Sequence, residues 1–152
     1  MMSQVLDQAT LDAMVDVFGG QALLGRYSIR SYLDFDRVVR DGLPVSAFRH
    51  AVESLGQPER TVVKGIGIPR STLGRRTQVG RLGFEDSERA VRLGAIIALA
   101  KVALGSTRAA GRWLLKPNTA LGGKIPIGLL QTDVGARRVE AVLRRALLGG
   151  FS

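Results

Sequence analysis

The 152-residue sequence contains no cysteine and a single histidine, His50. These absences exclude a disulfide framework, a thiolate nucleophile, an iron–sulfur cluster and a zinc site made of Cys and His. A Ser-His-Asp triad has only His50 available, and we expect this residue at the surface or half-buried on a helix. The acidic residues are scattered singly, which argues against paired carboxylates and metal clusters. We therefore expect no catalytic residue, no metal and no cofactor, and a protein that is not an enzyme.

Long hydrophobic runs are missing as well. The longest apolar stretch, residues 93–104, is interrupted by Lys101 and is too short to cross a bilayer. The first 18 residues contain three Asp and no basic residue, whereas a secretory signal peptide begins with positive charge. The sequence therefore predicts a soluble, cytoplasmic protein without a membrane partner.

Acidic residues are scarce over most of the chain. Lys and Arg number 22 against 13 Asp and Glu, which gives a formal net charge of +9. Residues 1–43 have a net charge of −2, so residues 44–152 carry +11. The densest basic stretch, residues 60–81, has six basic side chains and no acid. Such a concentration indicates an anionic partner, for which nucleic acid is the first candidate.

Apolar residues recur at helical spacing along most of the chain, without strands of useful length, so the sequence predicts an all-α fold. The expected helices are one within residues 6–24 that ends at Gly19-Gly20, then 34–40, 45–55, 58–64, 69–76, 87–104, 107–116, 127–130 and 133–148. The helix 87–104 is apolar nearly all round, which places it at the centre. Trp113 is expected in the core.

Three segments carry weaker patterns. The N-terminal helix is short and acidic, and we expect it to be only weakly tethered to the rest. Residues 27–30 are read as a short strand or an extended link. Residues 77–83 contain two glycines and are read as a connecting loop.

Residues 58–76 have the pattern of a helix-turn-helix. Such a motif requires a glycine in the turn and apolar residues that lock the second helix across the first. The sequence supplies them as Val63, Gly67, Ile68 and Leu73. The outward face of the second helix would then reach bases and phosphates in the major groove through Arg70, Ser71, Thr72, Arg75 and Arg76. The alternative is a helical hairpin with a solvated basic face. Val63, where alanine would pack better, and Gly65 inside a helix count against DNA binding.

Three motifs make the sequence similar to the Xre/MbcA/ParS-type antitoxins. The first resembles the helix-turn-helix of that family and reads Gly67-Ile68-Pro69-Arg70-Ser71-Thr72-Leu73. The other two resemble its toxin-binding domain and read Arg112-Trp113-Leu114 with Lys116-Pro117-Asn118-x-Ala120-Leu121-Gly122-Gly123-Lys124-x-Pro126, and Leu129-Leu130-x-Thr132-Asp133-x-Gly135-Ala136-x-x-Val139-Glu140. The resemblance runs from about Leu43 to the C-terminus. It implies an N-terminal extension (1–43), an Xre-like helix-turn-helix region (44–83) and a small helical toxin-binding domain (84–152).

The resemblance further implies a type II antitoxin that neutralises a RES-domain toxin by direct contact. That toxin degrades NAD, so NAD would be its substrate and not a cofactor of this chain. Antitoxins of this family are homodimers that bind operator DNA and repress their own operon, alone or in complex with the toxin. Their C-terminal segment obstructs the active site of the toxin. The corresponding toxin-binding residues here are Arg144, Arg145, Gly149, Gly150, Phe151 and Ser152.

Two questions stay open at the level of sequence. The arginines of the last helix either meet the toxin or only solvate the outer face of that helix; they are Arg137, Arg138, Arg144 and Arg145. The whole chain has two alternative interpretations. One is a stand-alone helix-turn-helix transcriptional regulator without a toxin partner, and the other is a cell-pole or scaffold interaction protein. A neighbouring gene for a RES-domain protein would favour the antitoxin.

Overall fold

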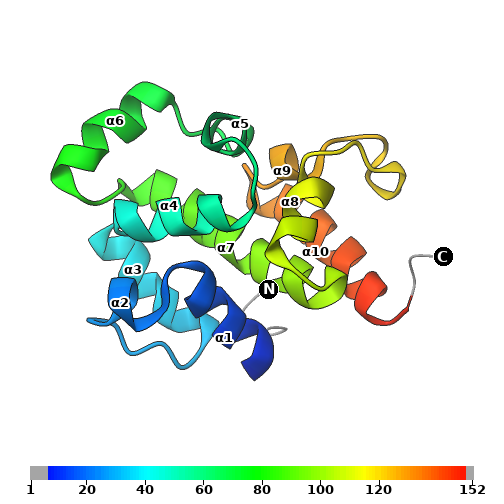
Figure 1. The fold of residues 1–152 in the computed structure, drawn as a ribbon, viewed down its shortest axis with the longest axis horizontal. Coiled ribbons are helices and arrows are strands. Elements are labelled where there is room, and N and C mark those ends of the chain that lie inside the picture. Colours follow the sequence, from blue (N-terminus) through cyan, green and yellow to red (C-terminus); the bar gives the residue numbers. More distant parts are fainter. Residues whose placement is uncertain (1–6, 150–152) are drawn as a thin grey trace.

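A computed structural model describes residues 7–149, and within these residues it contains helices and connecting segments but no strand. The element order is α1 (Gln8–Val17), α2 (Gly20–Leu24), η2 (Tyr32–Asp34), α3 (Phe35–Asp41), α4 (Val45–Ser54), α5 (Glu59–Gly65), α6 (Arg70–Val79), α7 (Phe84–Leu104), α8 (Thr107–Leu114), η3 (Thr119–Leu121), α9 (Pro126–Leu129) and α10 (Asp133–Leu147). Figure 1 shows their arrangement. The all-α prediction is confirmed.

Helix α7 forms the centre of the fold, as its all-round apolar pattern predicts (Figure 1). It spans 21 residues, and α1, α3, α8 and α10 all pack against it. Its first turn carries Glu85 and Asp86, whose negative charges are favourable near a helix N-terminus. Gly105, with a φ of 101°, ends the helix in the left-handed region, where glycine has no steric penalty.

The N-terminal segment is part of the core, so the expectation of a weakly tethered helix is wrong. Leu11, Met14 and Phe18 are buried, and α1 packs along α7. The ring of Phe18 lies against Gly94 of α7, where any side chain would collide with it. The acidic side chains Asp12 and Asp16 are exposed. The acidic charge of the segment suggested weak attachment to the rest of the fold, whereas its apolar face determines how it packs.

Most other boundaries agree with the sequence prediction, with small corrections. Residues 27–30 form a link rather than a strand, with Tyr27 buried. Helix α6 continues to Val79 through part of the expected loop 77–83. Thr77 lies within it and donates its hydroxyl to the Leu73 carbonyl at 2.8 Å, and Gly80 ends the helix at a φ of 89°. Helix α8 ends at Leu114, because Pro117 disfavours helical backbone geometry at the residue before it.

Within residues 7–149, no single helix has both the length and the apolar composition needed to cross a membrane. Only α7 and α8 taken together meet those two criteria, and they are bent by 110° relative to each other. Most residues of α7 from Ala90 to Ala100 are buried inside the fold.

Candidate nucleic-acid interface and C-terminal helix

Helices α5 and α6 form a helix-turn-helix whose locking residues are those expected from the sequence. Val63, Ile68 and Leu73 are buried. The Ile68 amide donates to the Val63 carbonyl at 3.1 Å, which fixes the turn onto the first helix. Gly67 adopts a φ of 82°, a conformation that side chains other than glycine rarely take. The turn is therefore defined by backbone geometry as well as by apolar packing.

Helix α6 is held mainly at its ends and presents most of its surface to solvent. Leu73 is its buried residue. Beyond its C-terminus the chain bonds back to the start of α4, where the Val45 amide donates to the Gly80 carbonyl at 2.9 Å and the Leu82 amide to the Leu43 carbonyl at 2.9 Å. In Figure 1, α6 lies along the upper edge of the molecule. This position leaves its polar face accessible to a large partner.

The five predicted DNA-contacting residues differ in their exposure to solvent. Arg70, Ser71 and Arg75 are exposed, whereas Thr72 and Arg76 are half-buried. The Arg76 guanidinium lies over Gly83, with Nη2 3.2 Å from where a β-carbon on that glycine would stand. The accessible edge of α6 is therefore formed by Arg70, Ser71 and Arg75, and Arg76 is directed toward the connection between α6 and α7.

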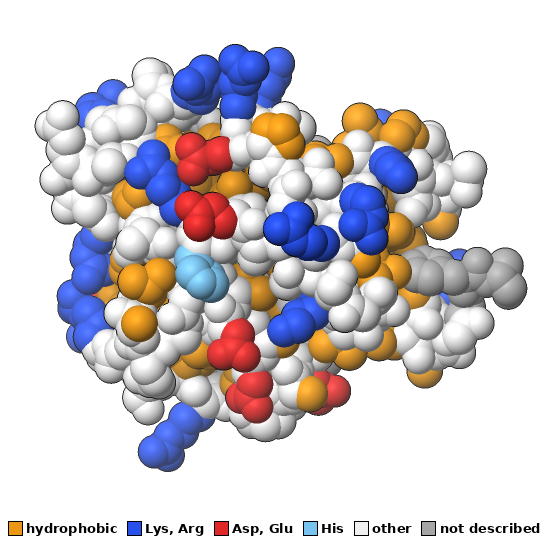
Figure 2. All heavy atoms as spheres, in the orientation of Figure 1, with side chains coloured by type: hydrophobic (Ala, Val, Ile, Leu, Met, Phe, Trp, Pro, Cys, Tyr) orange, Lys and Arg blue, Asp and Glu red, His pale blue; other side chains and the backbone are white. Residues whose placement is uncertain are grey.

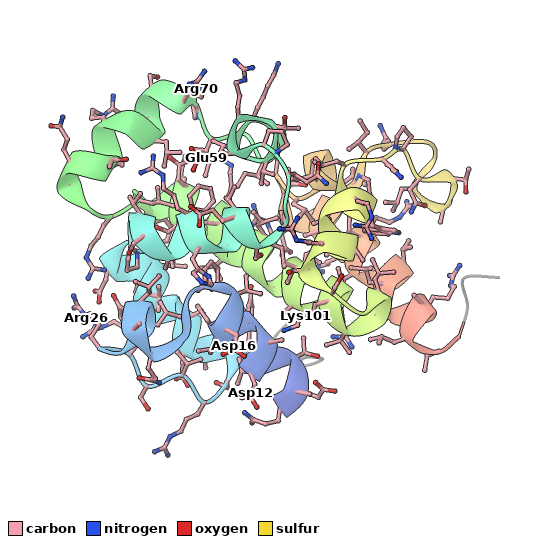
Figure 3. The ribbon with its side chains drawn as sticks, in the orientation of Figure 1. Asp12, Asp16, Arg26, Glu59, Arg70 and Lys101 are labelled. Atoms are coloured by element: carbon pink, nitrogen blue, oxygen red, sulfur yellow. The ribbon has the colours of Figure 1, made fainter. Side chains whose placement is uncertain are left out.

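Basic side chains gather along one edge of the surface. Figure 2 shows Lys and Arg side chains along the upper edge, over α5 and the start of α6, and acidic side chains over α1 at the lower edge. In Figure 3, Arg70 lies at the top and Asp12 and Asp16 at the bottom. Glu59 of α5 is paired with Arg49, with Oε1 at 3.3 Å from Nε. An anionic ligand approaching α6 would therefore meet a mostly positive surface.

Helix α10 packs one face onto α7 and leaves another unoccupied within the described residues. Thr132 caps it by accepting from the Gly135 amide at 3.0 Å, and Val139 and Leu143 are buried. The opposite face is an exposed row at i, i+4, i+7, i+11 and i+14, which we call the outer stripe: Val134, Arg138, Ala141, Arg145 and Leu148. Val134 is 76% and Leu148 88% exposed.

The arginines of α10 divide into two groups. Arg137 pairs with Asp133 at 3.0 Å, and Arg144 pairs with the mostly buried Glu140 at 3.0 Å. Arg138 and Arg145 are exposed and have no ion pair among residues 7–149. Of the two arginines predicted to contact a toxin, Arg145 therefore lies on the outer stripe and Arg144 is engaged with its own helix.

Sequence reasoning missed the apolar members of this face. Val134 and Ala141 precede Arg138 and Arg145 by four residues each. This helical spacing places them on the same face as the arginines, so their exposure could have been predicted from the sequence. Leu147, the last residue of α10, is 40% exposed. Gly149 is exposed and has a φ of 83°. The predicted residues Gly150, Phe151 and Ser152 lie outside the described part of the chain.

A hollow of about 680 Å³ lies between the helix-turn-helix and the C-terminal part, and we call it the α5–α9 groove. Its apolar lining comes from Leu115, Ile125 and Ile127, and its basic lining from Arg60 and Lys64. Among residues 7–149, no acidic side chain lines it. A partner that fits this groove would combine apolar and negatively charged groups.

The remaining sequence candidates have structural roles. His50 is exposed on α4, and its Nδ1 lies 2.8 Å from the Val17 carbonyl oxygen, which ties α4 to α1. Trp113 packs against the core but is only half-buried. Among residues 7–149, no three His, Asp or Glu side chains lie close enough together to hold a metal ion.

Comparison with known proteins identifies the two parts of the chain. Residues 34–94 match the Antitoxin Xre-like helix-turn-helix domain, and residues 98–147 match the Antitoxin Xre/MbcA/ParS C-terminal toxin-binding domain. Helix α7 extends from the first matched region into the second.

Two curated relatives are named Antitoxin Xre. One, from Yersinia enterocolitica serotype O:8 / biotype 1B, is 35% identical over 97 residues, which cover 62% of this chain and 66% of the relative. The other, from Pseudomonas putida KT2440, is 35% identical over 77 residues, 50% of this chain and 48% of the relative. The chain thus spans about half to two-thirds of the length of these relatives. It belongs to the Xre/MbcA/ParS antitoxin family, with an Xre-like helix-turn-helix domain followed by a C-terminal toxin-binding domain.

Proposed function

We propose that this chain is the antitoxin of a type II toxin–antitoxin pair and acts through two separate surfaces. The accessible edge of α6 binds operator DNA, and the C-terminal domain neutralises a RES-domain toxin that degrades NAD. The chain works in the cytoplasm as a homodimer and represses its own operon. The observation that carries the proposal is that exposed basic residues occur on both α6 and α10, each on its own matched domain.

For DNA binding, the support is the accessible edge of α6. Arg70 and Arg75 are exposed on a helix whose buried residue is Leu73. The first turn of such a helix enters the major groove in helix-turn-helix proteins, and arginine there pairs with guanine or with phosphate. Lys64 and Arg60, exposed on α5, extend the positive surface toward the neighbouring backbone phosphates.

For toxin binding, the support is the outer stripe together with the C-terminal segment that follows it. Arg138 and Arg145 lie between the exposed apolar residues Val134 and Leu148, so a partner surface of matching shape would offer acids between apolar contacts. Residues 149–152 then extend from the end of α10 into the active site of the toxin and obstruct it. The chain contributes binding and no chemistry of its own, and NAD is the substrate of the toxin.

The DNA-binding part is tested by two double variants that each remove two positive charges. Arg70→Ala with Arg75→Ala is expected to weaken binding to an operator fragment at least tenfold. If both side chains contact phosphates, the slope of log affinity against log salt should fall by about 2. Arg138→Ala with Arg145→Ala is the matched control and should leave both quantities unchanged. Equal losses in the two variants would mean that only net charge matters and would contradict recognition through α6.

The toxin-binding part is tested by coexpression with a cognate RES-domain toxin. Growth and cellular NAD content should be restored by the wild type and by the Arg70→Ala, Arg75→Ala variant. They should be restored less well by the Arg138→Ala, Arg145→Ala variant and by a chain lacking residues 149–152. Full neutralisation by the truncated chain would contradict the proposed obstruction of the toxin by the C-terminal segment. Operator binding without any neutralisation would instead identify a stand-alone transcriptional regulator.

A further inference from the structure

Helix α6 is a short helix whose placement depends on the contacts at its ends. It has 10 residues, and isolated helices of this length are marginally stable in water. Gly74 in its middle lowers helix propensity further. A hollow of about 290 Å³ lies between α6 and the α4–α5 pair, lined by residues that include Arg49, Val63 and Leu73. Packing along the length of α6 is therefore limited, and the contacts at its ends determine its direction.

Arg81, two residues beyond the end of α6, is bound to the N-terminal part of the chain. Its Nη1 donates to the Gly42 carbonyl at 2.7 Å and to the Tyr27 hydroxyl at 3.0 Å. The Tyr27 hydroxyl donates in turn to Oδ2 of Asp41 at 3.2 Å. We call Tyr27, Asp41 and Arg81 the Tyr27–Arg81 cluster. Although Arg81 belongs to the basic stretch 60–81, both hydrogens of its Nη1 are used inside the protein.

Tyr27 is itself fixed in place on the other side of the cluster. It is 8% exposed, and its amide donates to the Leu24 carbonyl at 2.9 Å. The guanidinium of Arg26 lies over the Tyr27 ring, 5.1 Å from its centroid, a distance at which an aromatic face attracts a cation. Nη2 of Arg26 is also 3.4 Å from Oδ2 of Asp41. The Tyr27 hydroxyl is therefore a fixed point to which Arg81 is bound.

From these contacts we infer that the Tyr27–Arg81 cluster orients α6 for operator binding. Tyr27 and Arg81 are positioning residues in this inference and do not themselves touch DNA. Tyr27 precedes residues 34–94, which match the helix-turn-helix domain, so the segment before that domain contributes to DNA recognition. The inference rests on the proposed function, in which the accessible edge of α6 binds operator DNA.

The cluster adds a second attachment to the one that the backbone provides. The backbone bonds from Val45 to Gly80 and from Leu82 to Leu43 join the end of α6 to the start of α4. A helix attached along one line can still rotate about that line, and an attachment away from it removes the rotation. Holding α6 in its binding orientation before DNA arrives avoids the entropic cost of ordering it on binding. Loss of the cluster should therefore lower operator affinity without removing any contact to DNA.

The first test compares Tyr27→Phe with Tyr32→Phe in the full chain, with a DNA duplex from the promoter of its own operon. Tyr27→Phe keeps every charge and removes only the hydroxyl that joins Arg81 to Asp41. Operator affinity should fall roughly threefold to tenfold, with an unchanged slope of log affinity against log salt, because no phosphate contact is lost. Tyr32→Phe makes the same change beside the start of α7 and should leave the affinity unchanged. Equal affinities for the two variants would overturn the inference.

Two further variants separate positioning from phosphate contact and from a general loss of stability. Arg81→Ala should weaken operator binding with the slope again unchanged, whereas a lost phosphate contact would lower the slope by about 1. The Tyr27→Phe, Arg81→Ala double variant should bind about as well as Arg81→Ala alone, because both changes break one cluster. Thr132→Ala removes the cap of α10 and should leave operator affinity unchanged. A lower slope for Arg81→Ala, or an equal loss in Thr132→Ala and Tyr27→Phe, would overturn the inference.

Amide hydrogen exchange of the free chain separates this inference from the proposed function, because it requires no DNA. Tyr27→Phe should speed exchange in α6, whose local opening becomes easier, and leave exchange in α10 unchanged. Unchanged exchange in α6 would overturn the inference, even if the wild type binds its operator. Faster exchange in a chain whose wild type binds no operator would contradict the proposed function and support the attachment of α6 through the cluster.

Discussion

Gly65 of the helix-turn-helix and Ile127 of α9 are in direct contact, so close that a β-carbon on Gly65 would lie 2.7 Å from Cγ2 of Ile127. A hydrogen bond reinforces the contact, because Nε2 of Gln131 donates to the Gly65 carbonyl at 2.9 Å. Gly65 costs helix propensity in α5, yet its lack of a side chain lets α9 approach. The glycine that counted against DNA binding in the sequence is therefore explained by contact between the two domains.

This contact gives the first prediction. Gly65→Ala gains up to about 1 kcal/mol of helix propensity but crowds a buried β-branched side chain, which typically costs about 1–3 kcal/mol. We expect a net loss of roughly 1–2 kcal/mol in the free energy of unfolding, measured by urea denaturation. Gly74→Ala in α6 is the matched control, since nothing lies within 4 Å of its β-carbon position, and it should stabilise the protein.

A double-mutant cycle separates crowding from other causes. Ile127→Ala removes the atoms that a Gly65→Ala methyl would meet, so the double variant should lose at least about 1 kcal/mol less than the sum of the single losses. Simple additivity of the two losses would mean that the two residues are not coupled. It would also remove the steric explanation for a glycine in α5.

The second prediction concerns the buried hydroxyl of Ser87. Its Oγ accepts from the Leu43 amide at 2.8 Å and reaches the Leu82 carbonyl at 3.4 Å, joining the segments on either side of the helix-turn-helix. Ser87→Ala leaves the buried Leu43 amide without a partner, at a cost of about 1–3 kcal/mol. Chemical denaturation should show this loss, whereas Ser46→Ala at an exposed position of α4 should change stability by less than about 0.5 kcal/mol. Equal effects would argue against a role for the hydrogen bond.

The third prediction concerns the packing of the N-terminal helix through Phe18. This ring is fully buried, and its centroid is 5.8 Å from that of Phe35. Phe18→Ala should lower the free energy of unfolding by about 3–5 kcal/mol, while Asp12→Ala, on the exposed face of the same helix, should have little effect. A loss below about 1 kcal/mol for Phe18→Ala would show that α1 is weakly tethered after all.

Much of the fold could be predicted from the sequence because helix positions depend on local patterns. Pro44 and Gly105 mark helix boundaries where they stand in the chain, and the apolar residues of α7 show that it is central. The contacts of Gly65 and Phe18 could not be predicted, because their partners Ile127 and Gly94 are distant in sequence. In the local sequence, a glycine that allows another helix to approach closely cannot be distinguished from one that only lowers helix propensity.

The candidate sites show the same division between local and tertiary information. The pairing of Arg144 with Glu140 follows the i, i+4 rule and was available from the sequence. The position of Arg76 over Gly83 was not, because it depends on how the chain turns after α6. Tyr27 and Arg81 are 54 residues apart in the chain, and only the fold brings their side chains together. Side-chain clusters of this kind require the tertiary structure.

The last prediction follows from Tyr32, whose side chain lines a hollow between α3 and the start of α7. Burial raises the pKa of Tyr32 from 10.0 to about 12, even though nearby Arg92 opposes the shift. In the unfolded chain this phenol ionises near pH 10, while the native protein keeps the proton up to about pH 12. Between these values the native state binds more protons, so the free energy of unfolding falls as pH rises. A shift of this size corresponds to roughly 2–3 kcal/mol.

The variant Tyr32→Phe isolates this contribution, because it keeps the ring and removes the ionisable hydroxyl. Below about pH 9 the difference in stability between wild type and variant should not depend on pH. From pH 10 to 12 the wild type should lose stability relative to the variant, by on the order of 2 kcal/mol in total. Urea unfolding at fixed protein concentration across this range measures the difference. Parallel curves for the two proteins would mean that Tyr32 ionises equally easily in both states and is not buried in the native protein.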